Sequence, residues 1–307
     1  MRTFIAGGTG LVGSRLVVRL LERNDQVTVL TRRPEVARQK WGQSCAVVTG
    51  DPMQPGPWMD GLADCDGVVN LVGEGVFNRR WSASFKELLR TSRVLSTRNI
   101  VVALSKNPHN AAGQPKILVN ASAIGYYGPT GDEELTEDSP AGSDMLARLC
   151  VEWEQEAQAG ATSGLRVVLL RVGVVLDREG GALKKMILPF KLFMGGKTGS
   201  GKQWVSWIHH EDLVGMIVLA LDEARARGPM NGTAPNPLPN RDFARALGRA
   251  LHRPSIMPAP AFALRVVLGQ VAGVITKGQR VLPRKALEWG YVFKFPDIDV
   301  ALNDALS

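Results

Sequence analysis

Short apolar runs alternate with longer segments of helical spacing along the first 175 residues of the chain. The runs span residues 3–6, 27–30, 46–48, 67–72, 117–121 and 167–175. They are rich in apolar and β-branched residues without strict polar alternation, which is typical of strands buried on both faces of a parallel sheet. Helical spacing is found at residues 13–23, 82–105 and 144–159. This alternation predicts an α/β protein with a doubly wound parallel sheet.

The pattern changes after residue 176. Glycines gather at 195–201, and prolines gather at 229–239 and 254–260. We therefore expect two units, a Rossmann NADP-binding domain and a smaller, mixed substrate lobe. The first spans residues 1–176, with its sheet completed by parts of 203–235, and the second spans 177–307 and includes a C-terminal region at about 254–302.

Composition is that of a folded protein in a reducing compartment. Apolar residues make up 45% of the 307 positions, which is enough for a sizeable core and excludes disorder for most of the chain. The three cysteines, Cys45, Cys65 and Cys150, form neither a disulfide framework nor a metal-ligand spacing. No apolar signal-peptide core follows Arg2, and no run approaches the length of a membrane span. We expect a cytoplasmic protein without a metal site.

The net charge of +8 is confined to one segment. Residues 241–285 contain nine Lys or Arg and one acid, Asp242, so the rest of the chain is neutral. An anionic substrate, an anionic lipid surface or solvent could face this segment. Nucleic acid is not expected, because the segment shows neither a basic platform with interleaved aromatic residues nor helix-turn-helix spacing.

A glycine-rich turn directly follows the first predicted strand. Gly7, Gly10 and Gly13 form a G-x-x-G-x-x-G pattern that leads into the first predicted helix. Glycine permits a tight turn and lets backbone amides approach a pyrophosphate, which then faces the positive end of the helix. The position of the pattern, after a strand at the start of the chain, predicts dinucleotide binding.

The end of the second predicted strand indicates which dinucleotide binds. An NAD site places an acid here for the ribose 2′-hydroxyl, but this chain has Thr31, Arg32 and Arg33, with no acid before Glu35. Two guanidinium groups can pair with a 2′-phosphate or stack on adenine. The cofactor is therefore predicted to be NADP(H), unless both arginines are solvated loop charges.

The ends of the next two strands supply further candidate contacts. Asp51 follows the third strand, where its carboxylate could accept a hydrogen bond from the adenine amino group. Leu71, Val72 and Gly73 end the fourth strand, beside the expected nicotinamide ribose.

The chain resembles the extended short-chain dehydrogenases/reductases over its whole length. The resemblance rests on GGTGLVG at 7–13, NLVGEG at 70–75, SAIGYYG at 122–128 and QWVSWIH at 203–209, which Asp212 follows. It is to the atypical branch called the epimerase family or SulA-like, whose C-terminal region also has VLP at 281–283 and G-Y-x-F at 290–293. The resemblance implies a Rossmann fold like that of NAD-dependent epimerases and dehydratases, NADP(H) binding and a substrate lobe, but no particular substrate.

The resemblance also assigns residues to the cofactor. It places Gly7, Gly10, Leu11, Val12 and Gly13 at the pyrophosphate, Thr31 and Arg32 at the 2′-phosphate, and Leu71 and Val72 near the ribose. Arg93 is similar to a family position that reaches the cofactor. The alternative for Arg93 is a surface arginine on the helix at 82–105.

The catalytic Tyr-x-x-x-Lys pair of ordinary members is absent. In those enzymes the tyrosine moves a proton and the lysine lowers its pKa. Family spacing places Leu146 and Cys150 at the two positions. The chain has only Tyr126, Tyr127 and Tyr291, and the residues four positions after them are Thr130, Gly131 and Phe295.

Three hydroxyl groups are candidate catalytic substitutes. Ser122 follows the fifth strand and could contact a substrate carbonyl or the cofactor, although Ala123 aligns better with the ordinary catalytic position. Tyr126 or Tyr127 could supply a phenol, and the alternative is that the ring packs over the nicotinamide or closes the pocket.

Two further polar groups have structural interpretations that we favour. His209 could be an acid or base, but more simply caps a helix that begins near Asp212. The acids between 132 and 138 are expected to form a solvated edge. These are Asp132, Glu133, Glu134, Glu137 and Asp138.

Three functions are consistent with the sequence. The first is an NADPH-dependent oxidoreductase or nucleotide-sugar-epimerase-like enzyme that lacks the usual Tyr-x-x-x-Lys pair. Its substrate would be a small molecule, which could be anionic. The second is a catalytically silent NADP(H) sensor. The third is peripheral membrane contact through the apolar segment 259–275 and its basic neighbours, although a helix packed on the substrate lobe is the favoured interpretation of that segment. The sequence does not define an oligomeric state.

Overall fold

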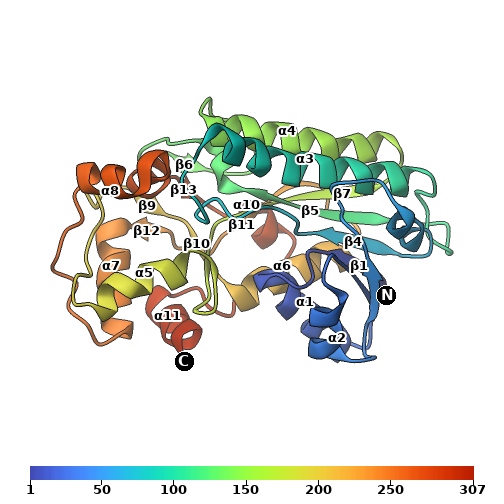
Figure 1. The fold of residues 1–307 in the computed structure, drawn as a ribbon, viewed down its shortest axis with the longest axis horizontal. Coiled ribbons are helices and arrows are strands. Elements are labelled where there is room, and N and C mark those ends of the chain that lie inside the picture. The colour runs from blue at the N-terminus through green and yellow to red at the C-terminus, as the bar shows by residue number, and fades with distance from the viewer.

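Seven parallel strands form the central sheet of the computed structural model, which describes residues 1–307 (Figure 1). The strands are β1 (Arg2–Ala6), β2 (Gln26–Thr31), β3 (Ala46–Thr49), β4 (Gly67–Asn70), β5 (Ile117–Ala123), β7 (Arg166–Val172) and β11 (Gly228–Gly232). Their order is β11-β7-β5-β4-β1-β2-β3, so the direction of winding reverses between β1 and β4. The predicted doubly wound α/β fold is confirmed. In such folds, ligands bind at the carboxyl ends of the strands beside this reversal.

Helices cover both faces of the sheet (Figure 1). One face carries α3 (Ala83–Ser105) and α4 (Met145–Thr162), and the other carries α1 (Leu11–Glu22), α2 (Pro34–Trp41) and α6 (His210–Asp222). Neighbouring residues of β1 point to opposite layers. Phe4 joins the apolar cluster that includes Ile100 of α3, whereas Ile5 joins the cluster that includes Leu16 of α1. This two-sided burial explains why the strands are apolar runs without polar alternation.

The remaining elements lie beyond the carboxyl ends of the strands or connect them (Figure 1). They are β6 (Glu134–Leu135), β8 (Val174–Leu176), α5 (Gly181–Lys191), β9 (Trp204–Val205), β10 (Trp207–His209), β12 (Leu238–Pro239), α7 (Asn240–Ala250), α8 (Ala261–Leu268), α9 (Ala272–Thr276), β13 (Arg280–Val281), α10 (Arg284–Glu288), α11 (Ile298–Leu306) and 3₁₀ helices at Pro57–Leu62, Ile124–Tyr127 and Gly269–Val271. The short strands pair as β10 with β8, β12 with β9 and β13 with β6. These pairs connect distant parts of the chain around the edge where the cofactor is predicted.

The apolar run at 167–175 is two strands rather than the single predicted one. β7 ends at Val172, and β8 begins at Val174 and pairs with β10 instead of the central sheet. A Cβ atom on Gly173 would lie 2.5 Å from the carbonyl oxygen of Ser206. Only glycine therefore lets the chain leave the central sheet here and pair with β10. The close approach that requires glycine comes from Ser206, which is distant in sequence.

One apolar core runs through both predicted units. Its largest cluster joins Ile5 and Val119 of the sheet to Phe243 of α7 and Leu302 of α11. β11, at 228–232, forms the edge of the main sheet beside β7. The division of the chain at residue 176 stays a prediction.

The three cysteines are free and buried. Burial raises the pKa of Cys65 to about 11 and that of Cys150 to about 12. Both thiols are therefore protonated near neutral pH, and they pack as small apolar groups. Separately, no helix combines the length and the hydropathy that crossing a membrane requires.

Candidate functional site

The glycine turn between β1 and α1 is closed by backbone contacts that exclude side chains. Gly7 has a φ of +84°, and a Cβ atom there would lie 3.0 Å from the carbonyl carbon and oxygen of Leu71, just beyond β4. A Cβ atom on Gly13 would lie 2.2 Å from the carbonyl oxygen of Gly7. Glycine therefore allows β1, α1 and the segment after β4 to meet at one point. This point is the reversal of the sheet order.

The start of α1 presents unpaired backbone donors at this point. Gly10 is the N-cap and supplies no capping side chain, and the first turn holds no acid. The backbone amides of Leu11, Val12 and Gly13 donate no hydrogen bond within the protein. Free amides at the positive end of a helix bind anions. The geometry fits the pyrophosphate of a dinucleotide.

Two unpaired cations follow β2, the strand next to β1. Thr31 is buried, and its hydroxyl accepts a hydrogen bond from the Arg33 amide at 3.0 Å, which fixes the turn. The side chains of Arg32 and Arg33 are exposed, and neither guanidinium makes a hydrogen bond or an ion pair within the protein. Both guanidinium groups are therefore available to a phosphate beside the glycine turn.

The residues predicted near adenine and the ribose lie at the ends of β3 and β4. One carboxylate oxygen of Asp51 accepts the Met53 amide at 3.0 Å, and the other makes no hydrogen bond within the protein. The Leu71 amide donates to Ala6 in β1 at 2.9 Å, and the Val72 amide donates to the side chain of Asn70 at 3.2 Å. These bonds hold the segment after β4 against the glycine turn. Contact of these residues with a cofactor stays a prediction.

A buried amide cluster that the sequence analysis missed supports this segment. The side-chain nitrogen of Asn70 donates to Asn120 of β5 at 2.7 Å and to the hydroxyl of Thr97 in α3 at 3.0 Å. The Trp153 indole in α4 also donates to Thr97, at 2.9 Å. Because every partner is buried, the cluster fixes β4 relative to both helices. Two asparagines inside apolar strand runs were the available signal.

Arg93 packs beneath the same segment instead of lying on the open surface of α3. Its guanidinium donates to the carbonyl oxygens of Leu89 and Glu74, each at 2.9 Å, and lies 5.1 Å from the Trp153 ring centre. A Cβ atom on Gly73 would lie 3.1 Å from its central carbon. Burial lowers the pKa of Arg93. The half-buried cation has no carboxylate partner, so an anion bound there would stabilise it. Its contact with the cofactor stays a prediction.

Apolar groups occupy the part of α4 that the family spacing assigns to the catalytic pair. A Cβ atom on Gly125, in the turn after β5, would lie 3.5 Å from the Cβ of Leu146 and 3.8 Å from the sulfur of Cys150. Neither residue replaces a phenol or an ammonium group. Any proton donor must therefore come from another element.

Two of the three candidate hydroxyls already have protein partners. Ser122 is buried and donates to Glu154 at 2.6 Å. Tyr127 is buried, donates to Asn231 at 2.7 Å and accepts from Arg171 at 2.9 Å. Burial raises the pKa of Tyr127 to about 12. Catalysis by either residue stays a prediction, and it requires these bonds to be exchanged for a substrate.

Tyr126 differs from its neighbour. The Arg171 guanidinium lies 3.5 Å from the centre of its half-buried ring, which is a close cation–π contact. Its hydroxyl donates to no protein group and is not among the buried unpaired atoms. Tyr126 is therefore the candidate whose hydroxyl is free for another molecule.

A buried ion pair organises this end of the site. Arg171 at the end of β7 and Glu154 of α4 share two hydrogen bonds of 2.8 Å, and both side chains are almost fully buried. The same guanidinium contacts Tyr126 and Tyr127. The pair therefore links β7, α4 and the turn that carries both tyrosines. The sequence analysis did not identify it.

The acidic segment is the expected exposed edge at Asp132, Glu133, Glu134 and Asp138, but not at Glu137. Glu137 is buried, and its carboxylate accepts the amides of Asn231 at 3.0 Å and Lys285 at 3.1 Å. Burial raises its pKa. The neighbouring acids also have partners: Asp132 accepts from Trp204, Glu134 pairs with Arg280, and Asp138 pairs with Arg284. The expectation was wrong for Glu137, because its partners Asn231 and Lys285 lie far along the chain. The segment anchors residues 280–285.

Comparison with known proteins decides the family. Residues 3–231, from the first strand to β11, match the NAD dependent epimerase/dehydratase family. The chain belongs to this family. Residues 259–305 match a domain of unknown function (DUF1731), which coincides with the C-terminal region expected at about 254–302.

Relatives of this epimerase-family chain match it over nearly its full length. The chloroplastic epimerase family protein SDR39U1 homolog of Arabidopsis thaliana is 41% identical over 99% of this chain and 86% of the relative. The crystal structure of human epimerase family protein SDR39U1 with NADPH has a TM-score of 0.87 and 36% identity, covering 99% of each chain. A nucleoside-diphosphate sugar epimerase from Corynebacterium glutamicum has a TM-score of 0.77 and 30% identity over all of this chain and 58% of its own. The human structure agrees with the cofactor predicted from Arg32 and Arg33.

His209 of the epimerase-family chain has the structural role that we favoured. It is the N-cap of α6, and its Nδ1 accepts the Glu211 amide at 3.2 Å. The ring is fully buried, and its Nε2 lies 3.2 Å from a carboxylate oxygen of Asp304. Nearby, the Asp212 carboxylate accepts the amides of Lys294 and Phe295 at 2.8 and 2.9 Å. The segment therefore holds the C-terminal tail in place.

The burial of His209 predicts a pH-dependent stability. Burial, and then the neighbouring His210, lower the pKa of His209 from 6.5 to about 4. The unfolded chain binds the His209 proton more tightly than the folded chain does. The contribution of neutral His209 to the free energy of unfolding is therefore fully present above pH 6.5 and is lost as the pH drops towards 4. We expect His209→Asn, which keeps a capping side chain, to remove about 3 kcal/mol of this acid-induced loss. Urea unfolding of both proteins across this range measures the difference. Parallel stability curves would exclude this role for His209.

Proposed function

We propose that this epimerase-family protein is an NADP(H)-dependent oxidoreductase of the atypical extended short-chain type, acting on a small molecule. One observation carries the proposal. Three unpaired amides at the start of α1 lie beside the sheet reversal, and the unpaired Arg32 and Arg33 follow the adjacent strand. Donors suited to a pyrophosphate and cations suited to a 2′-phosphate therefore lie on neighbouring strand ends, which supports the proposal. NADPH in the human relative's crystal structure supports the same cofactor.

The chain's own residues would bind and orient the dinucleotide. The bound cofactor supplies the hydride chemistry. The amides of Leu11, Val12 and Gly13 would hold the pyrophosphate, and Arg32 with Arg33 would hold the 2′-phosphate. The segment after β4, fixed by the Asn70 cluster, would support the ribose. The half-buried and uncompensated Arg93 favours an anionic group nearby, either on the cofactor or on the substrate.

Tyr126 is the proposed proton donor to the substrate. Leu146 and Cys150 occupy the positions of the usual catalytic pair, and the hydroxyls of Ser122 and Tyr127 are held by protein partners. The hydroxyl of Tyr126 has no such partner, and Arg171 fixes its ring from one face. A positioned phenol can transfer a proton as hydride moves.

Tyr126→Phe tests this role. With a substrate found by screening sugar nucleotides, aldehydes, ketones and quinones for NADPH oxidation, we expect kcat to fall by about a hundredfold or more. The dissociation constant of NADPH should not change. Tyr127→Phe is the matched control, and it should lower the melting temperature by breaking the bonds to Asn231 and Arg171. An unchanged kcat in Tyr126→Phe would remove Tyr126 from the mechanism.

A catalytically silent NADP(H) sensor is the second candidate. The apolar contacts of Leu146 and Cys150 with the turn after β5 favour it, because they leave no lysine beside a tyrosine. A sensor would bind NADPH but would not oxidise it in the presence of any substrate class in the panel. It would also bind a partner with an affinity that depends on the ratio of NADP+ to NADPH. A pull-down indifferent to cofactor state would count against the sensor.

The state of the cysteines supports a reducing location. Cys45, Cys65 and Cys150 are all free and buried. Free thiols persist where cellular reductants keep them reduced. We therefore propose that the protein acts in the cytoplasm.

A further inference from the structure

α8 exposes an apolar surface that the rest of the molecule does not cover. Its sequence, AFALRVVL, contains one polar residue, yet none of its eight residues is buried. Phe262, Val266 and Val267 are 74%, 73% and 67% exposed. The expectation that this segment packs on the substrate lobe is met only in part: Ala263, Leu264 and Leu268 are half-buried, but the opposite side of α8 is uncovered. Val271 and Ala272, just beyond α8, are buried. Water around such side chains is unfavourable, so the helix is suited to a contact outside the chain.

The exposed apolar surface continues beyond α8. The backbone joins the segment before α8 to the segment after α5, since the Met257 amide donates to Gly195 at 3.0 Å and the Ala259 amide to Lys197 at 2.9 Å. Figure 1 shows α5, α7 and α8 at the end of the molecule opposite the N-terminus. We call this surface the apolar end. Its exposed members are Leu192, Phe193, Met194, Ile256, Met257, Phe262, Val266 and Val267.

Unpaired cations border the apolar end. The Arg253 guanidinium lies 4.8 Å from the centre of the Phe193 ring, and its only hydrogen bond is to the carbonyl oxygen of His252. Lys191, Lys197 and Arg265 are also exposed, and no carboxylate lies within ion-pair distance of them. By contrast, Arg249 is neutralised by Asp299, with bonds of 2.6 and 2.8 Å.

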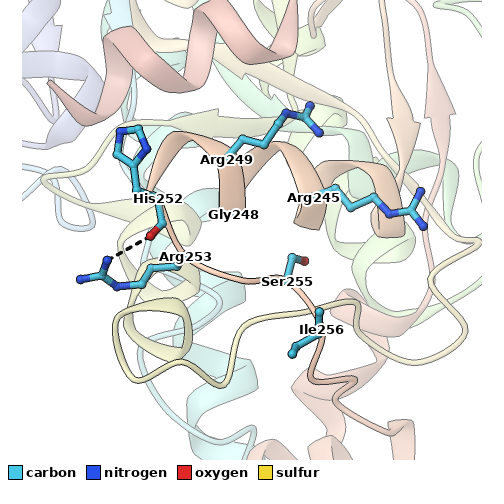
Figure 2. A pocket seen from close by; sticks show the side chains of 7 residues that line it. All are labelled: Arg245, Gly248, Arg249, His252, Arg253, Ser255 and Ile256. Carbon is cyan, nitrogen blue, oxygen red and sulfur yellow. Dashed lines mark hydrogen bonds between the residues drawn. The ribbon is translucent and has the colours of Figure 1, made fainter.

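The shape of this border favours an extended anionic surface over a small anion. An open pocket of about 770 Å³ lies beside α7 and is lined by Arg245, Gly248, Arg249, His252, Arg253, Ser255 and Ile256. Figure 2 shows the guanidinium groups of Arg245, Arg249 and Arg253 pointing to different sides of this pocket. Because Arg249 pairs with Asp299 and Arg245 with Asp242, Arg253 is the one unpaired arginine of the three, so the pocket does not converge several free cations on one small anion.

We propose that the apolar end docks on an anionic lipid surface. The apolar side chains would insert at the boundary between headgroups and acyl chains, and the bordering cations would face lipid phosphates. Of the basic residues in 241–285, Arg253 and Arg265 are exposed and unpaired on this border and are complementary to such a surface. Five others form ion pairs within the protein: Arg241, Arg245, Arg249, Arg280 and Arg284. A second copy of the chain fits less well, because a symmetric contact would bring the unpaired cations of both copies together.

The docking helix α8 contacts the connection between β4 and α3, which begins at the predicted cofactor site. The Arg80 side chain donates to the carbonyl oxygens of Val266 and Val267 in α8. Arg80 follows the segment after β4 that contains Leu71 and Val72. The docked helix is therefore hydrogen-bonded to the connection between β4 and α3. The docking proposal does not depend on the oxidoreductase proposal.

Vesicle co-sedimentation of the full chain tests the docking proposal. We expect binding to phosphatidylcholine vesicles that contain phosphatidylglycerol, weaker binding without it, and loss of the difference at high salt. The triple variant Phe262→Ser, Val266→Ser and Val267→Ser should bind at least about tenfold more weakly. Removing two charges, Lys191→Gln and Arg253→Gln, should weaken binding to anionic vesicles by about tenfold.

Matched variants control for exposure and charge. Val18 in α1, Val102 in α3 and Val292 in the connection before α11 are exposed outside the apolar end, so the triple serine variant at these positions should bind as wild type does. The charge control is Lys106→Gln with Arg227→Gln, which are exposed and lie outside the bordering set. All replaced side chains are on the surface, so similar melting temperatures verify folding.

Three results would overturn the docking proposal. One is wild-type protein that does not sediment with anionic vesicles. The second is equal binding by wild type and the α8 triple variant. The third is a dimer in solution that the α8 triple variant abolishes, without vesicle binding, because it would assign the apolar end to a second copy. Light scattering after gel filtration measures this last outcome.

Discussion

Replacing both Arg32 and Arg33 by alanine is expected to weaken NADPH binding by about a hundredfold, while NADH binding changes by less than about threefold. Neither guanidinium makes a hydrogen bond or ion pair within the protein, so the replacement removes no internal contact of these side chains. Only NADPH carries the 2′-phosphate. The two charged contacts should therefore be lost for one cofactor and not the other. Isothermal titration calorimetry with both dinucleotides measures the change.

A nearby charge change separates a specific phosphate contact from general electrostatics. Arg38 and Lys40 are exposed on α2, shortly after the two arginines. Replacing both by alanine removes the same charge and should reduce NADPH affinity by less than about threefold. If the Arg32 and Arg33 double variant lost affinity for NADH as much as for NADPH, the 2′-phosphate assignment would be wrong.

Glu154→Ala is expected to destabilise the fold by about 3–5 kcal/mol, the cost of leaving one partner of a buried ion pair uncompensated. The replacement leaves Arg171 buried without its carboxylate and leaves Ser122 without its acceptor. It also frees the guanidinium that packs on Tyr126. Thermal unfolding should show a fall in melting temperature of about 10 °C.

Two variants isolate the cause of this loss. Glu156 lies two residues further along α4 and pairs with the exposed Arg98, so Glu156→Ala should cost less than about 1 kcal/mol. Replacing both Glu154 and Arg171 by methionine removes both buried charges and should recover part of the stability. If Glu154→Ala cost no more than Glu156→Ala, the buried pair would not be what holds this end of the site.

The sequence predicts the central sheet well because its signals are local. The apolar runs correspond to the strands, and the helix predicted at 82–105 is α3, Ala83–Ser105. The break at Gly173 could not be predicted in this way, since it depends on the carbonyl oxygen of Ser206. The exposure of α8 also escaped prediction. Its composition is that of a core helix, and no local property of a sequence shows that the covering element is missing.

In the candidate site, too, local motifs could be predicted from the sequence, whereas contacts between distant residues could not. The glycine turn and the two arginines could be recognised because each is a contiguous motif next to a strand. The partners of Glu137 lie 94 and 148 positions away, so a cluster of acids seemed solvated when one of them is buried. Glu154 offered a weak signal that was not used. It lies four positions after Cys150 and three before Ala157, on the buried face of α4.

Titration of the wild-type protein with NADPH and with NADH tests whether the glycine turn and the arginines form an NADP(H) site. We expect NADPH to bind at least about tenfold more tightly than NADH, because only NADPH carries the 2′-phosphate that Arg32 and Arg33 can contact. Equal affinities for the two dinucleotides, or no binding of either, would contradict this assignment.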